Sequence, residues 1–256
     1  MVVWNMANVP RHVTFSLSRQ ETITLIQWPR FTRTMDSTVR FILSLSIGFA
    51  VIIGIVRFRK IDPSYYPFLF VCFAALAVEL LHRTLMENGL PKSLFFLLNI
   101  YSYIDFLLFL WLFSNWRLFD SKKSTFIGIA GFFFVAWIVS NIIFTGFVNK
   151  VNLYFFILYS FALIFFSVST FNRMVVHERS SIFKNPKFWI CLGVIIFYSF
   201  FIVYSSTGVT FMHIPSIEFR IGLQAIMVYS NLLVNILYAV AIIWIPRRKN
   251  FTSLFW

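Results

Sequence analysis

The hydrophobic residues of this chain fall into seven continuous runs that are separated by short polar segments. The runs cover residues 40–56, 65–86, 93–116, 125–145, 152–172, 188–206 and 222–245. A helix needs about 20 apolar residues to cross the hydrocarbon of a bilayer, so each run can span it. The runs lack both the polar stripe of a surface helix and the alternation of a barrel strand. The pattern therefore predicts an all-α membrane protein, a bundle of seven transmembrane helices.

Residues that stop helices stand at several ends of these runs. Pro63 precedes the second run, Asn88 and Gly89 close it, Pro186 precedes the sixth, and Pro246 ends the seventh. These residue types are typical of helix boundaries. We therefore expect one seven-helix transmembrane domain over residues 35–249, followed by a short cytoplasmic tail over residues 250–256.

The first 34 residues are expected to form a poorly ordered tail. Arg19 and Glu21 interrupt their only apolar stretch, so residues 1–34 lack the core of a signal peptide. This absence suggests that translation starts at Met35. An intact mass of the native protein that includes residues 1–34 would contradict the hypothesis.

The composition excludes a soluble domain. Hydrophobic residues make up 59% of the chain and charged residues 12%, and the mean hydropathy is +0.81, whereas about a quarter of a soluble domain is charged. The net charge of +13 does not indicate nucleic acid, because the cations lie in the gaps between apolar runs. Such cations are typical of topology signals and of contacts with anionic lipid headgroups. The lipid bilayer is therefore the expected partner.

The distribution of Lys and Arg predicts the orientation. Loops on one side carry ten of these cations and loops on the other side carry four, and the C-terminal tail adds more to the richer side. Because cytoplasmic loops are enriched in Lys and Arg, the N-terminus is expected outside and the C-terminus inside. The first run has cations on both flanks and by itself gives no direction. The longest cytoplasmic loop, residues 173–187, has no room for a folded output domain.

Two acidic residues fall within the apolar runs, Glu79 in the second and Asp105 in the third. A carboxylate there costs at least ~2.5 kcal/mol, so it usually faces the bundle interior or water. His82 and Arg83 follow Glu79 by three and four positions, on the same helical face. We therefore expect Arg83 to pair with Glu79.

Further polar residues share faces with these acids. Tyr101 lies one turn before Asp105, and Asn99 is in the same run, while Gln224, Asn231, Asn235 and Tyr238 form one stripe on the last run. We expect the second, third and seventh helices to meet around an outward-facing polar pocket. The candidate ligand-binding residues are Glu79, His82, Arg83, Asn99, Tyr101, Asp105, Asn231, Asn235 and Tyr238. In the alternative interpretation these groups only join helices; such hydrogen bonds are common and average about 0.6 kcal/mol each, which favours it.

Ser46, Ala50 and Gly54 recur every fourth residue in the first run. Small residues at this spacing let another helix approach closely. They would serve either a dimer or packing within the bundle, and the frequency of internal seams favours packing. The sequence leaves the oligomeric state open.

Motifs of known catalytic or cofactor sites are missing. The four histidines include no metal-ligand spacing, and neither GxSxG nor a P-loop is present. The last run has no lysine, so a retinal Schiff base has no attachment point. We therefore expect no catalytic residue, no metal and no cofactor. An enzyme site built on Glu79, His82 and Asp105 has no motif in its favour.

Short motifs resemble a loose group of proteins. They are Ala-Val-Glu-Leu-Leu around Glu79, Asn99-Ile100-Tyr101 with Asp105, Phe219-Arg220, and Asn235 with Tyr238-Ala239. Over residues 35–249 the chain resembles uncharacterised bacterial seven-helix inner-membrane proteins of unknown function. The resemblance implies a location in the bacterial inner membrane and the membrane part of a sensory system that lacks its own kinase. It implies no ligand and no catalytic residue.

These observations predict a non-enzymatic, receptor-like or sensory membrane protein that acts through a signalling protein at the cytoplasmic face. The alternative is a small transporter or transport-accessory subunit in which Glu79 and Asp105 bind an ion or a proton. The odd number of helices and the lack of a visible inverted repeat or of a pair of Gly/Pro-broken helices argue against the alternative.

Overall fold

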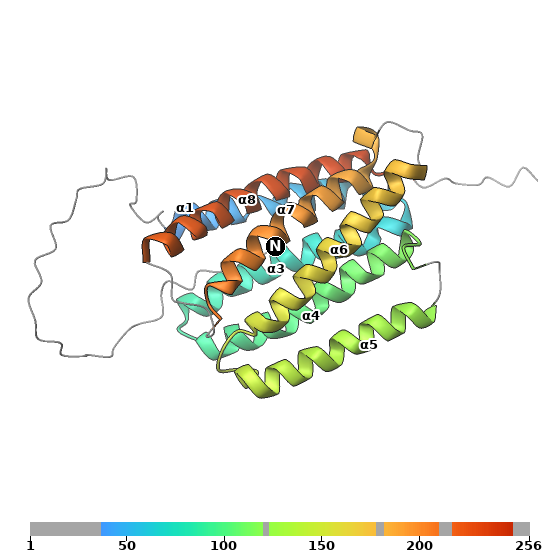
Figure 1. Cartoon of the computed structure of the whole chain (residues 1–256). Helices are drawn as coiled ribbons and strands as arrows, with labels where there is room; N and C mark the ends of the chain where they lie inside the picture. Colours follow the sequence, from blue (N-terminus) through green and yellow to red (C-terminus); the bar gives the residue numbers. More distant parts are fainter. Residues whose placement is uncertain (1–36, 120–122, 178–181, 210–216, 248–256) are drawn as a thin grey trace, which may run out of the picture.

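The protein is helical throughout the residues that the structure describes, which are 37–119, 123–177, 182–209 and 217–247 of a computed structural model (Figure 1). The α-helices are α1 (Ser37–Ser44), α2 (Ile47–Arg57), α3 (Tyr66–Glu87), α4 (Pro91–Asn115), α5 (Lys123–Ser140), α6 (Leu153–His177), α7 (Pro186–Ser206) and α8 (Ile217–Trp244). A π-helical turn, Asn141–Thr145, extends α5, and no strand occurs in the described ranges. Seven segments are long and apolar enough to cross a membrane, with α1 and α2 together forming the first. The predicted all-α fold with seven such helices is confirmed.

The helix ends follow from local chemistry. Pro91 and Pro186 occupy the first turns of α4 and α7, where a missing N–H costs nothing. Asn185 caps α7 by accepting a hydrogen bond from the backbone N–H of Lys187 at 3.0 Å. After α3, Gly89 adopts a φ of +66°, a conformation that glycine takes without a steric penalty. The predicted boundaries hold to within a few residues where such signals stand.

The first span contains a break that the sequence analysis did not predict. Residues 40–56 were expected to be one helix, but α1 ends at Ser44 and α2 begins at Ile47. In the intervening turn, the Ser46 N–H donates to the Leu43 carbonyl at 3.2 Å, a tighter pattern than that of an α-helix. The Ser44 hydroxyl lies 2.8 Å from the Phe41 carbonyl oxygen, and its one hydrogen is shared between this carbonyl and the Glu79 carboxyl group. Serine hydroxyls that bond to the preceding turn compete with the helix and bend it.

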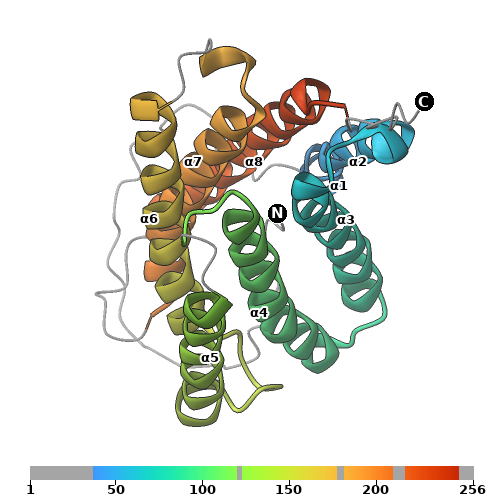
Figure 2. The ribbon, with the colours of Figure 1, turned by 90° about the vertical axis from the view of Figure 1, so that its right-hand side faces the viewer.

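Six of the seven spans form a closed arrangement, seen nearly end-on in Figure 2. Consecutive helices pack in order within two groups, α2–α3–α4 and α6–α7–α8. The groups meet where α2 packs against α8 and where α4 packs against α6. Helix α5 lies outside, against α4 and α6, and buries only Phe133. The fold is therefore two three-helix groups joined by a peripheral helix.

The first and last spans finish at the same end of the bundle. Arg57, the last residue of α2, donates to the carbonyl oxygens of Ile242 at 2.7 Å and Ile245 at 3.0 Å, and it also bonds to that of Ile243. The backbone N–H of Asp62 bonds to the Pro246 carbonyl at 3.2 Å. The two spans thus run parallel, which is what an odd number of crossings requires.

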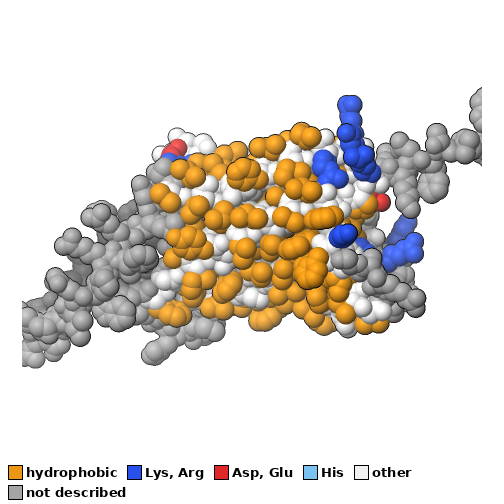
Figure 3. Space-filling view, turned by 90° about the horizontal axis from the view of Figure 1, so that it is seen from above, with side chains coloured by type: hydrophobic (Ala, Val, Ile, Leu, Met, Phe, Trp, Pro, Cys, Tyr) orange, Lys and Arg blue, Asp and Glu red, His pale blue; other side chains and the backbone are white. Residues whose placement is uncertain are grey.

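The exterior is apolar along most of the bundle. Figure 3 shows hydrophobic side chains covering the described face between its two ends, with most of the visible Lys and Arg gathered at one end. Large apolar side chains such as Phe49, Val56 and Phe165 are about two-thirds exposed or more. A soluble monomer rarely exposes a belt of this extent. The chain is built as a multi-pass membrane protein.

The small residues of the first span pack inside the bundle. Ser46, Ala50 and Gly54 are buried. A Cβ atom added at Gly54 would lie 3.1 Å from the Leu69 side chain on α3. The interpretation of this seam as internal packing is confirmed.

Candidate functional site

The structure distributes the predicted site residues over separate places. Glu79 and Asn235 contact the break in the first span, and Asn231 lies one turn before Asn235 on α8. Asp105 and Tyr101 join a tyrosine cluster, Asn99 binds a loop, Tyr238 packs between α3 and α7, and His82 and Arg83 lie near one end of α3. The hydrogen bonds among the described residues do not join these side chains into one group, and the pocket expected between the second, third and seventh helices stays a prediction.

Glu79 is bound to the break. It lies on α3 with only 5% of its surface exposed, and the Ser44 hydroxyl donates to its Oε1 at 2.5 Å. Its other oxygen, Oε2, is buried and has no hydrogen-bond partner among the described residues. Half of this carboxyl group is therefore unsatisfied in the interior, where such groups are costly.

Arg83 does not pair with Glu79. Its Nε bonds instead to the carboxylate of Glu87, one turn further along α3, and this is the only ion pair in the part of the chain that is described. Its guanidinium also lies 4.8 Å from the ring centroid of Phe41. Both glutamates are four positions from Arg83, and Glu87 is the exposed one near the end of the helix, where a charged pair keeps its hydration. The half-buried His82 precedes Arg83.

Asn235 and Asn231 lie one turn apart on α8 and are almost fully buried, at 0% and 1% exposure. The side-chain amide of Asn235 donates to the Ser46 hydroxyl at 2.8 Å. The Asn235 Oδ1 and both polar atoms of Asn231 have no hydrogen-bond partner among the described residues. Buried amides usually have partners, so this concentration is unusual. The other unpartnered atoms belong to Trp116, Ser167 and Ser205, which lie singly on other helices.

We call Ser44, Ser46, Glu79, Asn231 and Asn235 the break cluster. The two serines flank Leu45 at the break and link it to Glu79 on one side and to Asn235 on the other. The oxygens are of the carboxylate, amide and hydroxyl types that bind hard cations. Groups of three His, Cys, Asp or Glu side chains, which would suit other metals, do not occur among the described residues. Ser44 and Ser46 point to opposite sides of the helical turn, so Glu79 and Asn235 are held on different sides of it. Glu79 can hold a proton or, with the Ser44 hydroxyl, contact a small cation.

The two serines of the break cluster were not among the predicted site residues. Ser44 was not singled out, and Ser46 was considered only as a small residue for packing. Two serines that flank one apolar position in a transmembrane run are the signal that could have found them. Their hydroxyls can bond to the backbone and to neighbouring helices at the same depth.

Asp105 is fully engaged by tyrosines. Tyr198 donates to its Oδ2 at 2.5 Å and Tyr101 to its Oδ1 at 3.3 Å, and Tyr159 also hydrogen-bonds this carboxyl group. The rings of Tyr159 and Tyr198 lie 5.7 Å apart. These residues come from α4, α6 and α7, so the cluster joins the two three-helix groups. Asp105 thus joins helices through hydrogen bonds, which is the role that the alternative interpretation gives to the interior polar groups.

Asn99 fixes the connection between α5 and α6. Its side-chain amide donates to the carbonyl oxygens of Phe147 at 2.7 Å and Lys150 at 3.0 Å. Its Oδ1 accepts from the backbone N–H of Asn152 at 2.8 Å. With all its side-chain groups bound to backbone, Asn99 has a structural role.

Tyr238 packs in the interior near these groups. It is 1% exposed, and its ring meets Phe68 edge-on with centroids 5.0 Å apart. The same ring lies against Gly193 on α7, where an added Cβ would come within 2.4 Å of it. Tyr238 therefore fills the space between α3, α7 and α8.

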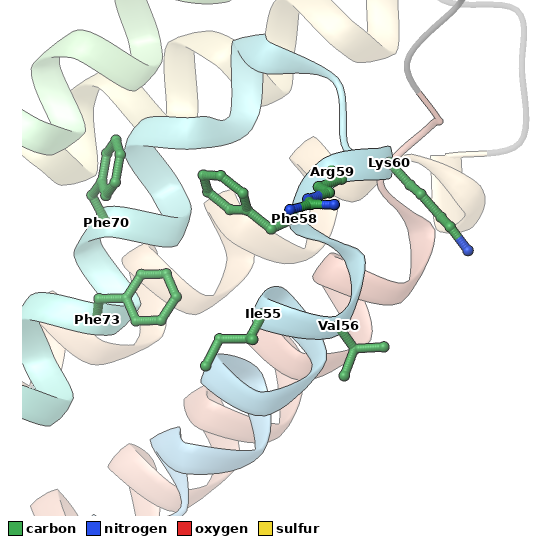
Figure 4. Close-up of a pocket in the computed structure, with 7 residues that line it drawn as sticks. All are labelled: Ile55, Val56, Phe58, Arg59, Lys60, Phe70 and Phe73. Carbon is green, nitrogen blue, oxygen red and sulfur yellow. The ribbon is translucent and has the colours of Figure 1, made fainter.

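A hollow of about 510 Å³ lies elsewhere, at the ends of α2 and α3. Figure 4 shows its lining, which is Ile55, Val56, Phe58, Arg59, Lys60, Phe70 and Phe73. None of the predicted site residues belongs to it. This hollow is thus a feature distinct from the break cluster.

The fold and the interior polar groups define a multi-pass, all-α membrane protein of seven spans. Comparison of the chain with protein-family models, with curated proteins and with solved structures finds no match. The resemblance to bacterial seven-helix inner-membrane proteins therefore stays a prediction.

Proposed function

We propose that the protein is a non-enzymatic membrane transporter of protons or small monovalent cations, or an accessory subunit of one, and that Glu79 is its ion-binding carboxylate. One observation carries the proposal: a buried carboxyl group, with one oxygen that has no partner among the described residues, lies against a turn of 3-10 hydrogen bonding inside a membrane-length helix. A stretch of 3-10 hydrogen bonding inside a helix often marks a functional hinge, and an ionisable residue within a membrane usually faces the bundle interior or an ion or proton path.

The chemistry of the break cluster supports this proposal. A charged carboxylate in hydrocarbon is costly unless a proton or a cation neutralises it. Asn231 and Asn235 carry further amide oxygens without a partner among the described residues, on α8, which meets the break through Ser46. A monovalent cation bound by one carboxylate would form a site with no net charge. Binding and release of one positive charge at Glu79 is therefore the event that we propose.

The arrangement of the spans also supports transport. The two groups α2–α3–α4 and α6–α7–α8 meet through α2 with α8 and through α4 with α6. A twofold axis along the bundle would relate these two contacts, and repeats related by such an axis are known in transporters. The peripheral α5 then accounts for the odd number of spans, which was one of the sequence arguments against transport.

We further propose that the N-terminus lies outside and the C-terminus inside, in a bacterial inner membrane. The excess of loop Lys and Arg supports this orientation, since cytoplasmic loops carry such an excess. The break cluster would then lie in the outer half of the membrane. The bacterial assignment is supported only by the sequence resemblance.

Flux through the purified, reconstituted protein tests the proposal. Proteoliposomes would be given an inward proton or sodium gradient, with a pH-sensitive dye or radioactive sodium as the probe. We expect flux above empty liposomes, and at least a tenfold loss in Glu79→Gln. The matched control is Glu87→Gln, on the same helix but exposed, which should keep the flux.

Two results would overturn the proposal. One is a Glu79→Gln protein with normal elution and melting that still carries the ion at the full rate. The other is a wild-type protein that carries neither ion yet co-purifies with a cytoplasmic kinase or regulator, which would favour the receptor-like function.

A further inference from the structure

Three cations, Arg57, Arg59 and Lys60, lie at the end of the first span, and their surroundings differ. Arg57 is bound to the carbonyl oxygens at the end of α8. Arg59 and Lys60 are exposed, and in the described structure neither forms an ion pair with a carboxylate. Two adjacent positive charges therefore remain available to an external anion.

The hollow described above begins at these two cations. Its walls are the side chains of Ile55 and Val56 on α2 and of Phe70 and Phe73 on α3 (Figure 4). Val56 is 75% exposed and Ile55 is 59% exposed, so the walls face outward. The hollow is thus apolar along its length and positively charged at one end.

Aromatic contacts hold this shape. Phe58, at the charged end, stacks on Tyr66 with ring centroids 5.0 Å apart. Phe70, on the wall, stacks on Trp111 of α4 at 6.3 Å. The hollow is therefore lined by side chains that are themselves packed, and its volume of about 510 Å³ is in the usual range of small-molecule sites.

The position matches the boundary of a membrane. The first span ends at Lys60 and the second begins at Pro63, so both cations lie where two spans leave the apolar belt. Phe73 is ten residues further along, which is about 15 Å deeper at 1.5 Å per helical residue. The charged end would meet headgroups while the apolar walls lie in hydrocarbon.

We propose that this hollow is a binding site for one anionic phospholipid. The phosphate lies between Arg59 and Lys60, and an acyl chain runs along Ile55, Val56, Phe70 and Phe73. Charge complementarity selects an anionic headgroup, and the apolar walls select a lipid over a free phosphate ion. The inference does not depend on the proposed ion transport.

Native mass spectrometry of the detergent-solubilised protein tests it, with phosphatidylglycerol and phosphatidylcholine of identical chains as probes. We expect tighter binding of phosphatidylglycerol. Arg59→Ala/Lys60→Ala should weaken its binding about thirtyfold, since each cation near a headgroup contributes about fivefold. Lys123→Ala/Lys184→Ala, which removes two exposed cations at the starts of other helices, should leave it unchanged.

A second variant separates a built site from general surface charge. Val56→Trp fills the hollow and keeps both cations, so it should weaken the binding of both lipids. Unchanged lipid binding in Val56→Trp, or equal losses in the two double variants, would overturn the site. Displacement of the lipid by millimolar inorganic phosphate would show that a free anion is the ligand and would also overturn it.

Discussion

The side-chain amide of Asn235 donates a hydrogen bond to the hydroxyl of Ser46, 2.8 Å away across the contact between α8 and the break in the first span. The bond leaves the Asn235 carbonyl oxygen facing the interior without a partner in the described structure. It therefore positions an acceptor as well as joining two helices.

We predict a measurable coupling between these two side chains. In a double-mutant cycle of Ser46→Ala and Asn235→Ala, the interaction energy should be about 0.6 kcal/mol and should not exceed about 1.7 kcal/mol, the range of hydrogen bonds between membrane helices. The interaction energy would be measured from the unfolding of the four proteins in bicelles at increasing concentrations of a denaturing detergent. Additive effects of the two substitutions would show that the bond contributes nothing.

Arg57 is predicted to stabilise the junction of α2 and α8. Its guanidinium satisfies carbonyl oxygens that the end of a helix leaves free, and hydrogen bonds from charged groups contribute about 1.5–3 kcal/mol. Arg57→Gln should lower the free energy of unfolding by about that amount. Arg59→Gln, two positions away and outside this junction, is the control, and in lipid-free detergent its melting temperature should match the wild type.

Gly193 is predicted to tolerate no side chain. An added Cβ would lie 2.4 Å from the Tyr238 ring, and overpacking of this kind costs about 1–3 kcal/mol. Gly193→Ala should therefore lower the melting temperature. Gly128→Ala is the matched control on α5, where nothing lies within 4 Å of the added atom. Equal melting of the two variants would mean that α7 and α8 do not pack as described.

Asp105 is predicted to support the fold and not the ion path. Tyr198→Phe removes a donor from a buried carboxyl group and should cost about 1–3 kcal/mol of stability. Asp105→Asn should also melt earlier, yet both variants should keep the ion flux of the wild type in proteoliposomes. Loss of flux in Asp105→Asn with unchanged melting would instead place this residue on the path.

The helices could be predicted from the sequence because length and apolarity decide them. The predicted helix ends agree with the structure near Pro186 and near Asn88 and Gly89. They agree less well where no such residue marks the boundary. Helix α6 continues to His177, five residues beyond the predicted end at residue 172, because the polar residues after the apolar run do not break a helix. Residues 1–34 and 250–256, which were predicted to be tails, lie outside the described residues.

The site could be predicted only in part. The buried positions of Glu79, Asp105 and Asn235 follow from their place in apolar runs. Their partners come from other helices, and a single sequence does not specify which helices are neighbours. Arg83 illustrates the limit, since its spacing from the two glutamates is the same and only their burial, with Glu79 inside the bundle and Glu87 exposed at the helix end, separates them. The break between Ser44 and Ile47 contains no Gly or Pro, so the usual signal was missing.

The break divides the first span into two pieces with different attachments. The segment Ile47–Arg57 is anchored at its far end to the last turn of α8, while the segment Ser37–Ser44 packs against α8 and contacts α3 through Ser44 and Phe41. A tilt of the shorter piece would thus change the surroundings of Glu79 through Ser44 without disturbing the anchored end. The carboxyl group of Glu79 is therefore coupled to the shorter piece, and the backbone contacts of α8 to the longer one.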